Sequence, residues 1–399
     1  MYDLIIVGGG PCAVMAAIQA SKRNKKILII EQNDDILKKL ALSGNGRCNL
    51  TNNKNLKDFL QHLDNKKYLY NIIKEFEPKK IIKYFTNLGV ELKEEDNNRI
   101  FPKSNKAQTI IDALKKELIN TEINLNEKVE EVENKNNIFI VTTNKNVYKS
   151  TKLLLACGGI SYPELGNNIE NYNLALSLNH SLVKLKPQEC SINVKMPLPD
   201  LMGVSLENIE ITIKDNDKHL QVLNGDVLFT HYGLSGPGIL NSSFSINNAT
   251  SDKILISLSL FNKKYDGIKK VIHDEITNNP TKNIKTLLKK ELPNSLINYL
   301  LNKHNIIDVN NAYLKKDTIN NLAHDLSSFT FEFKSFYKPQ YAFLTGGGIN
   351  LKEINPKTLE SKLVPNLYLG GEMIDICGEL GGYNITIALA CGYVIGNNC

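Results

Sequence analysis

Residues 43–49 read Ser-Gly-Asn-Gly-Arg-Cys-Asn, a stretch with two glycines, several hydrogen-bonding side chains and one thiol. No apolar periodicity marks it as a helix or a strand. Glycine lets the backbone approach a flat or charged ligand closely, because it has no Cβ atom. We therefore expect this stretch to lie against a ligand. Within it, Cys48 could donate a proton during a reduction or could be a buried packing residue, and both interpretations stay open.

A second candidate for chemistry is the stretch Phe-Thr-His-Tyr-Gly-Leu-Ser-Gly-Pro at residues 229–237. Its His231 could exchange a proton with a substrate or only cap a turn. The neighbouring Tyr232 could orient a carbonyl group or stack on a base. Ser235 is not expected to be a nucleophile, because the stretch lacks the Gly-x-Ser-x-Gly turn and a matching triad.

Arginine is scarce in this chain, since only Arg23, Arg47 and Arg99 occur among its 48 basic residues. A chain that uses lysine almost throughout keeps arginine where a planar, bidentate donor is needed. Arg47 is therefore expected to bind a cofactor or an anionic group of a substrate. Arg99 has two open interpretations, a site role or a hydrogen bond that stabilises the fold.

The chain opens with a phosphate-binding pattern. Residues 4–7 form a continuous apolar run, as in a buried parallel strand, and lead to a turn with Gly8, Gly10 and Ala13 at Gly-x-Gly-x-x-Ala spacing. A helix and a second strand follow before Glu31. The two glycines allow a tight turn and close approach to a pyrophosphate, the helix offers its N-terminal amides, and the acid accepts ribose hydroxyls. This order predicts a dinucleotide site, and Glu31 argues against a phosphorylated ribose there.

Length and composition set broad limits. A chain of 399 residues with 42% hydrophobic residues is expected to fold into more than one domain or subdomain. The net charge of +6 suits a polyanionic partner, but a solvated lysine surface explains it equally well. Seven scattered cysteines without a Cys-x-x-Cys pair predict a reducing cytoplasm and neither a disulfide framework nor a metal site. No apolar run is long enough to cross a bilayer, so no membrane association is expected.

The strand and helix patterns predict an α/β protein whose Rossmann-like dinucleotide-binding domain is interrupted by a β-rich antiparallel domain and a helical subdomain. Helices are expected over residues 33–42 and 66–88 of the first domain. The dinucleotide-binding domain is predicted to comprise residues 1–187 and 338–399. The inserted β-rich domain is predicted to comprise residues 188–264 and 327–337, and the helical subdomain residues 265–326.

Seven stretches are spread over nearly the full length of the chain: GGGPCAVMAA at 8–17, LALSGNGRCNLTN at 40–52, RIFPKSNKA at 99–107, GGISYPELG at 158–166, VLFTHYGLSGPGIL at 227–240, AFLTGGGINLKEINPKTLESKLVPNLYLGGE at 342–372 and GGYNITIALACGYVIG at 381–396. In these stretches the sequence resembles the YhiN/BaiN-type family of NAD(P)/FAD-dependent oxidoreductases, which are flavoproteins with two dinucleotide-binding domains. The loops at 166–172 and 377–380 depart from the family pattern, which puts transfer of substrate and nicotinamide specificity in doubt.

The resemblance implies FAD as cofactor, NAD(P)H as electron donor, a β-barrel-like inserted domain and a helical lid. It favours hydride transfer to a conjugated C=C bond, with a uridine of ribosomal RNA as substrate and dihydrouridine as product. One alternative is a small-molecule oxidoreductase that acts on an enone or an amine. Another is a flavin-binding or redox-sensing protein without turnover.

The resemblance also assigns residues to the cofactor. It places the isoalloxazine ring against residues 43–49, the start of the last helix near N1 and O2 of the ring, and the backbone of Val129 near the adenine. The residues predicted to bind FAD are Gly8, Gly10, Pro11, Cys12, Ala13, Glu31, Lys39, Ser43, Gly44, Asn45, Gly46, Arg47, Cys48, Asn49, Val129, Gly158, Gly159, Gly371, Glu372, Gly381, Gly382, Tyr383 and Asn384. The residues predicted to act in catalysis are Cys48, His231 and Tyr232.

Overall fold

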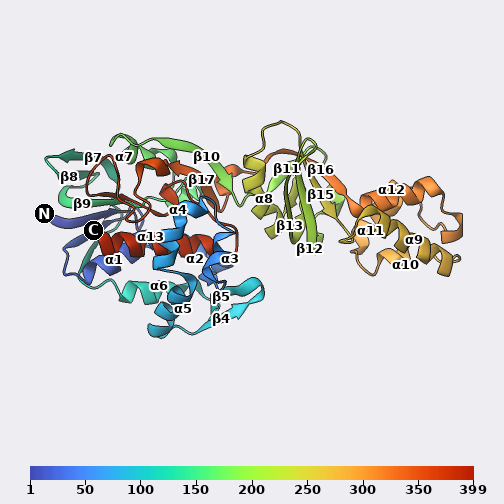
Figure 1. Ribbon diagram of the computed structural model, residues 1–399, viewed down its shortest axis with the longest axis horizontal. Helices are drawn as coiled ribbons and strands as arrows, with labels where there is room; N and C mark the ends of the chain where they lie inside the picture. The colour runs from blue at the N-terminus through green and yellow to red at the C-terminus, as the bar shows by residue number, and fades with distance from the viewer. The chain divides into compact units, whose positions relative to one another are not determined.

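A computed structural model describes residues 1–399. The chain forms two compact units (Figure 1). Unit 1 consists of Met1–Pro187 and Gln340–Cys399, and unit 2 consists of Gln188–Pro339. Each unit has its own cluster of buried apolar side chains. Each therefore has the core that a domain needs for its own stability.

A seven-stranded sheet forms the centre of unit 1. Its order is β6 (Thr121–Asn124), β2 (Ile27–Ile30), β1 (Tyr2–Val7), β9 (Val147–Leu155), β8 (Ile138–Thr143) and β7 (Val129–Lys135), with β18 (Leu367–Leu369) also paired to β9. The first four strands and β18 run parallel, whereas β8 and β7 are antiparallel. Leu4–Val7 is buried, as expected for a strand whose two faces are covered by helices.

The helices α1 (Pro11–Ser21) and α13 (Tyr383–Asn398), from opposite ends of the chain, pack tightly against each other in unit 1. Two glycines of α13 make this approach possible. A Cβ atom at Gly392 would lie 2.2 Å from the carbonyl oxygen of Cys12, and one at Gly396 would lie 2.4 Å from that of Ala16. Arg23 then holds the end of α13, because its guanidinium donates to the carbonyl oxygens of Asn397 (2.7 Å) and Cys399 (2.5 Å).

Two helix predictions for unit 1 were wrong in their bounds. The helix expected over 66–88 is divided into α4 (Lys66–Glu75) and α5 (Pro78–Asn87), because proline cannot continue a helix but suits its first position. The helix expected from residue 33 begins only at Lys38, as α2 (Lys38–Gly46). Before it, Asp35 accepts a hydrogen bond from the Ile36 amide (2.8 Å), a local bond that competes with helix formation.

The other elements of unit 1 are short. A small sheet contains β3 (Thr51–Asn52), β5 (Arg99–Pro102) and β4 (Leu92–Glu95), and β10 (Leu182–Gln188) pairs with β17 (Leu344–Ile349). The remaining helices are α3 (Leu56–Leu60), α6 (Ala107–Lys116) and α7 (Asn173–Leu176). The small sheet contributes neighbours of the stretch at 43–49, because Glu95 of β4 and Phe101 of β5 contact Arg47.

Unit 2 is a closed barrel of six antiparallel strands with helices attached. The strand order is β11 (Ile192–Val194), β14 (Gly233–Ser235), β13 (Lys218–Phe229), β12 (Ser205–Asp215), β15 (Ile254–Ser259) and β16 (Phe329–Phe336), and α8 (Pro237–Asn247) packs on β13. Between β15 and β16 the chain forms α9 (Tyr265–Asn278), α10 (Lys285–Leu288), α11 (Asn294–Lys303) and α12 (Lys316–Ser327). The predicted fold class, a Rossmann-like domain with a β-barrel and a helical insertion, is confirmed. None of the helices is both long and apolar enough to span a bilayer.

The close contact of α1 with α13 predicts a stability effect. Gly392→Ala should lower the free energy of unfolding by about 1–3 kcal/mol, because the added methyl group meets a backbone carbonyl that cannot move aside. Urea unfolding followed by circular dichroism measures the change. The control is Gly267→Ala in α9, where the nearest atom to the new Cβ is 3.9 Å away. In this variant the free energy of unfolding should stay the same or rise. Equal effects of the two substitutions would contradict the packing argument.

Candidate functional site

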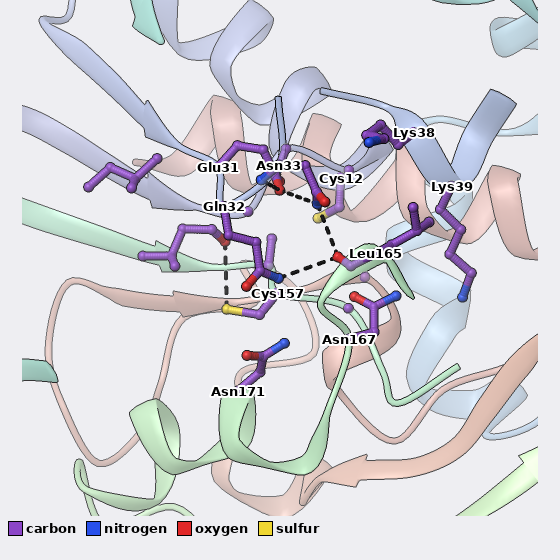
Figure 2. Close-up of a pocket in the computed structure, with 18 of the residues that line it drawn as sticks. Cys12, Glu31, Gln32, Asn33, Lys38, Lys39, Cys157, Leu165, Asn167 and Asn171 are labelled. Carbon is purple, nitrogen blue, oxygen red and sulfur yellow. Dashed lines mark hydrogen bonds between the residues drawn. The ribbon is translucent and has the colours of Figure 1, made fainter. Parts of the chain in front are cut away.

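A cavity in unit 1 opens where β1 and β2 end and α1 begins (Figure 2). This is the edge of a parallel sheet where nucleotides bind in Rossmann-like folds. Many of the residues that the sequence assigned to FAD line it together, although they come from distant parts of the chain. They are Gly8, Gly10, Pro11, Cys12, Glu31, Lys39, Val129, Gly158, Gly371 and Glu372.

The glycine turn leaves space for a phosphate. Gly8 has φ +101°, and a Cβ atom there would lie 2.5 Å from the carbonyl oxygen of Ala156. A Cβ atom at Gly10 would meet no atom within 4 Å and would occupy the cavity itself. No side chain caps α1, so amides of its first turn stay available to an acceptor, while Ala13 packs fully buried behind them. This cradle fits the pyrophosphate of a dinucleotide.

Glu31 stands beside this turn and is 8% exposed. Its Oε2 accepts a hydrogen bond from the Gly9 amide (2.6 Å), and its Oε1 accepts from the amide (2.8 Å) and the side-chain nitrogen (2.6 Å) of Asn33. A carboxylate has about four lone pairs, so the acid can still accept ribose hydroxyls. Sequence reasoning missed Asn33, although a polar residue two positions after the acid was a usable signal.

The loop at 165–171 forms one wall of the cavity. Asn33 donates to the carbonyl oxygen of Leu165 (3.0 Å), and Gln32 donates to that of Gly166 (3.1 Å). Asn167 and Asn171 of this loop line the cavity (Figure 2). The loop departs from the family pattern in sequence, yet its backbone carbonyls hold it against Gln32 and Asn33, which follow β2. Bonds to backbone carbonyls leave no signal in a sequence motif.

Lys39 and Glu372 form an ion pair of 2.5 Å at the margin of the cavity. The other oxygen of Glu372 accepts from the Thr345 amide (2.8 Å) and from the Ser161 hydroxyl (3.0 Å). A Cβ atom at Gly159 would lie 2.3 Å from the Thr345 hydroxyl, which gives this glycine a packing role. The predicted contact of Gly159 with the cofactor stays a prediction, because it does not line the cavity.

The stretch at 43–49 has the unusual backbone that its composition suggested. Helical geometry breaks inside α2, where Gly44 and Asn45 both have φ +57°. With its amide group in the orientation that satisfies both neighbours, the Asn49 side chain donates to the Thr51 carbonyl (3.2 Å) and accepts from the Gly382 amide (3.1 Å). The Asn52 side chain donates to the carbonyl oxygen of Gly381 (3.2 Å). The structure therefore joins the two segments that were predicted to hold the isoalloxazine ring, the turn after α2 and the start of α13.

Other residues predicted at these two segments have protein partners. Ser43 donates to the Leu40 carbonyl (2.7 Å), and Gly46 is the last residue of α2. The Asn384 side chain exchanges two hydrogen bonds with the backbone of Gly378 (2.7 and 2.9 Å). Tyr383 is 3% exposed and stacks on the His62 ring at 4.8 Å. Sequence reasoning did not single out His62, which no motif marks.

Arg47 is held by the protein. Its guanidinium pairs with Glu95, donates to the Asn105 side chain (2.9 Å) and lies 4.2 Å from the centre of the Phe101 ring. Arg99 lies 5.8 Å from the same ring and donates to a backbone carbonyl (2.9 Å), which gives it a role in the fold. The contact of Arg47 with a cofactor or substrate stays a prediction.

The three candidate catalytic residues differ in exposure. Cys48 has no exposed surface, and burial raises the pKa of its thiol to about 12, so it is protonated at neutral pH. His231 is exposed and Tyr232 is half-buried, and their rings lie edge to face with centres 4.9 Å apart. These two residues belong to unit 2, whereas Cys48 belongs to unit 1. Their roles in catalysis stay predictions.

Comparison with known proteins gives matches along the whole chain. The profile of the family described as "HI0933-like protein Rossmann domain" matches residues 2–398. A 3-dehydro-bile acid delta(4,6)-reductase from Clostridium scindens is 27% identical over 99% of this chain and 98% of its own length. A ribosomal RNA dihydrouridine synthase from Haemophilus influenzae is 25% identical over 98% of this chain and 96% of its own length. The solved structure of a 3-ketosteroid delta1-dehydrogenase from Sterolibacterium denitrificans superposes with a TM-score of 0.50 at 13% identity, over 100% of this chain and 99% of that one, and so shares the fold.

The contacts of Glu31 predict a loss of cofactor affinity in Glu31→Gln. A neutral amide keeps the shape but loses charge-assisted hydrogen bonds, so the dissociation constant for FAD should rise about 10- to 100-fold. Flavin fluorescence during titration of the apoprotein measures it. Glu133→Gln, which removes a surface ion pair with Lys135, is the matched control and should bind FAD as the wild type does. Equal losses in both variants would contradict the role of Glu31.

The burial of Cys48 predicts a pH dependence of its alkylation. The pKa of the thiol is raised from 9.0 to about 12, so at pH 8 the thiolate fraction should be about a thousandfold below that of a free cysteine. Mass spectrometry after brief iodoacetamide treatment should find Cys48 unmodified in the native protein and modified after unfolding in guanidinium. Rapid labelling in the native state would show that the thiol is accessible.

Proposed function

The chain belongs to the HI0933-like Rossmann family and is an FAD-dependent oxidoreductase, and from this premise we propose that its substrate is a uridine of ribosomal RNA. The resemblance to the YhiN/BaiN-type family is confirmed by the match over residues 2–398. In the proposed reaction NAD(P)H is the electron donor and dihydrouridine is the product. The reaction takes place in the cytoplasm, where ribosomal RNA is found.

The proposed reaction is the reduction of a C=C bond conjugated to a carbonyl group. FAD, when bound, would supply hydride transfer from the nicotinamide to an acceptor. In uracil the hydride reaches C6, a proton reaches C5, and the C5=C6 bond becomes single. NAD(P)H is oxidised to NAD(P)⁺, so the atoms and electrons balance. The names of two relatives, a dihydrouridine synthase and a bile acid delta(4,6)-reductase, suggest reductions of this class.

The cavity in unit 1 supports the proposed binding of FAD. The open space at Gly10 and the first turn of α1 would receive the pyrophosphate, and Glu31 would accept the ribose hydroxyls. The joined segments 43–49 and 381–384 would hold the isoalloxazine ring. The start of α13 would place the positive end of a helix dipole near the ring.

The proton for C5 must come from a group that solvent can protonate again. His231 is exposed, and an imidazole that solvent reaches can act as a general acid, so we assign it as the proton donor. Tyr232 beside it would orient the uracil carbonyl. Cys48 is protonated but sealed from solvent, which makes it the second candidate for this role.

Charge is the observation that favours RNA over an apolar small molecule. The chain carries 48 basic and 42 acidic residues, a net charge of +6. Such an excess attracts a polyphosphate chain and offers no benefit to an uncharged enone. A steroid-like enone, the substrate class in the name of one relative, is the alternative acceptor, and it is tested with the purified holoprotein.

Ribosomal RNA nucleosides from strains with and without the gene test the proposal. One dihydrouridine should be missing from the deletion strain and restored by the wild-type gene, as measured by mass spectrometry. His231→Ala should slow NAD(P)H-driven formation of dihydrouridine by about 10²- to 10⁴-fold, the usual effect of losing a general acid.

Two controls accompany this experiment. His219→Ala replaces another exposed histidine of unit 2 and should restore the modification fully. Enones and amines are offered to the purified holoprotein in parallel. An unchanged dihydrouridine content in a deletion strain that holds no redundant enzyme would refute the RNA proposal, and turnover of an enone would then replace it.

A further inference from the structure

Charge is unevenly distributed within unit 2. Residues 263–316, which we call the lysine lobe, contain eleven lysines and five acidic residues, a net charge of +6. The barrel residues 188–262 contain four lysines and eight acidic residues, a net charge of −4. The lobe comprises α9, α10 and α11 with the segment that leads into α12 (Figure 1). Unit 2 as a whole carries a net charge of only +1, so the positive residues of this unit are concentrated in the lobe.

The lysines of the lobe are largely uncompensated. Only Lys303 forms an ion pair, with Asp325 at 2.7 Å. Lys282, Lys315 and Lys316 are exposed and form no salt bridge. The segments that carry them lie together, because the amide of Asn311 donates to the carbonyl oxygen of Lys282 (2.8 Å). Unpaired, clustered ammonium groups bind phosphates and release counterions as they do so.

A different surface lies where β16 ends. The rings of Tyr232 and Tyr337 stack with centres 3.4 Å apart and planes 4° apart. His231 stands edge-on to both rings, and the ammonium group of Lys338 lies 5.4 Å from the centre of the Tyr337 ring. Both tyrosines are half-buried, while His231 and Lys338 are exposed. Aromatic rings with a neighbouring cation form the kind of platform on which unpaired bases stack.

Strand β16 separates the two surfaces. It begins at Phe329, whose ring centre lies 5.5 Å from the ammonium group of Lys303 in the lobe, and it ends at Phe336, beside Tyr337. Its eight residues span roughly 25 Å at about 3.3 Å per residue. A mononucleotide cannot contact both surfaces over that length, whereas a folded RNA with one splayed base can.

From these observations we propose that unit 2 docks RNA at two places. The lysine lobe holds phosphates of a structured segment, and the Tyr232–Tyr337 stack receives an unpaired base. This inference rests on the proposed function and adds how the RNA is held. An acidic protein would match the lysines but would have no base for the ring stack, which is why RNA is the partner that both surfaces favour.

The salt dependence of RNA binding tests the lobe. The holoprotein is titrated with deproteinised ribosomal RNA from the deletion strain at several NaCl concentrations. The combined variant carries Lys282→Gln, Lys315→Gln and Lys316→Gln. In it, the plot of the logarithm of the association constant against the logarithm of the salt concentration should become shallower, with the magnitude of its negative slope reduced by about two to three. The control variant Lys74→Gln, Lys79→Gln and Lys83→Gln removes three exposed lysines of unit 1 and should keep the wild-type slope.

Substitution of Tyr337 tests the ring stack. Tyr337→Ala should weaken RNA binding about 10-fold at every salt concentration and leave the slope unchanged, because stacking releases no counterions. Tyr337→Phe keeps the ring and should restore the affinity, which separates stacking from a folding defect. Circular dichroism and flavin absorbance verify that each variant is folded and loaded.

The outcomes distinguish docking from catalysis. Equal salt slopes in the two triple variants would refute phosphate binding by the lysine lobe. Unchanged RNA affinity in Tyr337→Ala would refute base stacking on the Tyr232–Tyr337 pair. Competition for the lobe by an acidic protein, without any effect of Tyr337→Ala, would overturn RNA as the partner. If these variants behave as expected while the deletion strain keeps its dihydrouridine, RNA docking stands and uridine reduction fails. If dihydrouridine is lost but both sets of variants bind normally, uridine reduction stands and this docking mode fails.

Discussion

The architecture of unit 1 depends on hydrogen-bond donors that the protein leaves open at the start of α1. No side chain caps this helix, Pro11 stands at its first position, and the glycine turn before it presents only backbone to the cavity. Open donors are costly unless water or a ligand satisfies them. The parallel strands place this turn at the edge of the sheet, and Glu31 at the end of β2 fixes it through the Gly9 amide (2.6 Å).

The second requirement is that α13 be held close to α1. Gly392 and Gly396 allow the two helix backbones to approach, and Arg23 secures the far end. With α13 fixed in this way, its start at Tyr383 is fixed as well. Asn49, which accepts from the Gly382 amide, and Asn52, which donates to the Gly381 carbonyl, then connect that start to the turn after α2. Helix packing far from the proposed isoalloxazine position therefore determines which loops can meet there.

The constraint on unit 2 is closure of its barrel. In a closed barrel every strand pairs with two neighbours, so no backbone edge is left unpaired and the outer surface is free to vary. The helical insertion between β15 and β16 adds apolar side chains to the barrel's own core cluster. That shared core lets the insertion carry eleven lysines on residues 263–316 while remaining folded. The same strand that returns from the insertion ends at the Tyr232–Tyr337 stack, so one rigid element relates the charged surface to the aromatic one.

The sequence by itself determined the features that depend on local sterics and periodicity. The buried strand Leu4–Val7, the glycine turn and the acid at position 31 follow from rules that act within about 30 residues. Tertiary structure alone decided that Cys48 is sealed, that Arg47 pairs with Glu95 and that Lys39 pairs with Glu372. Those contacts join segments that are distant in the sequence. The spacing of residues along the chain does not predict which distant segments meet.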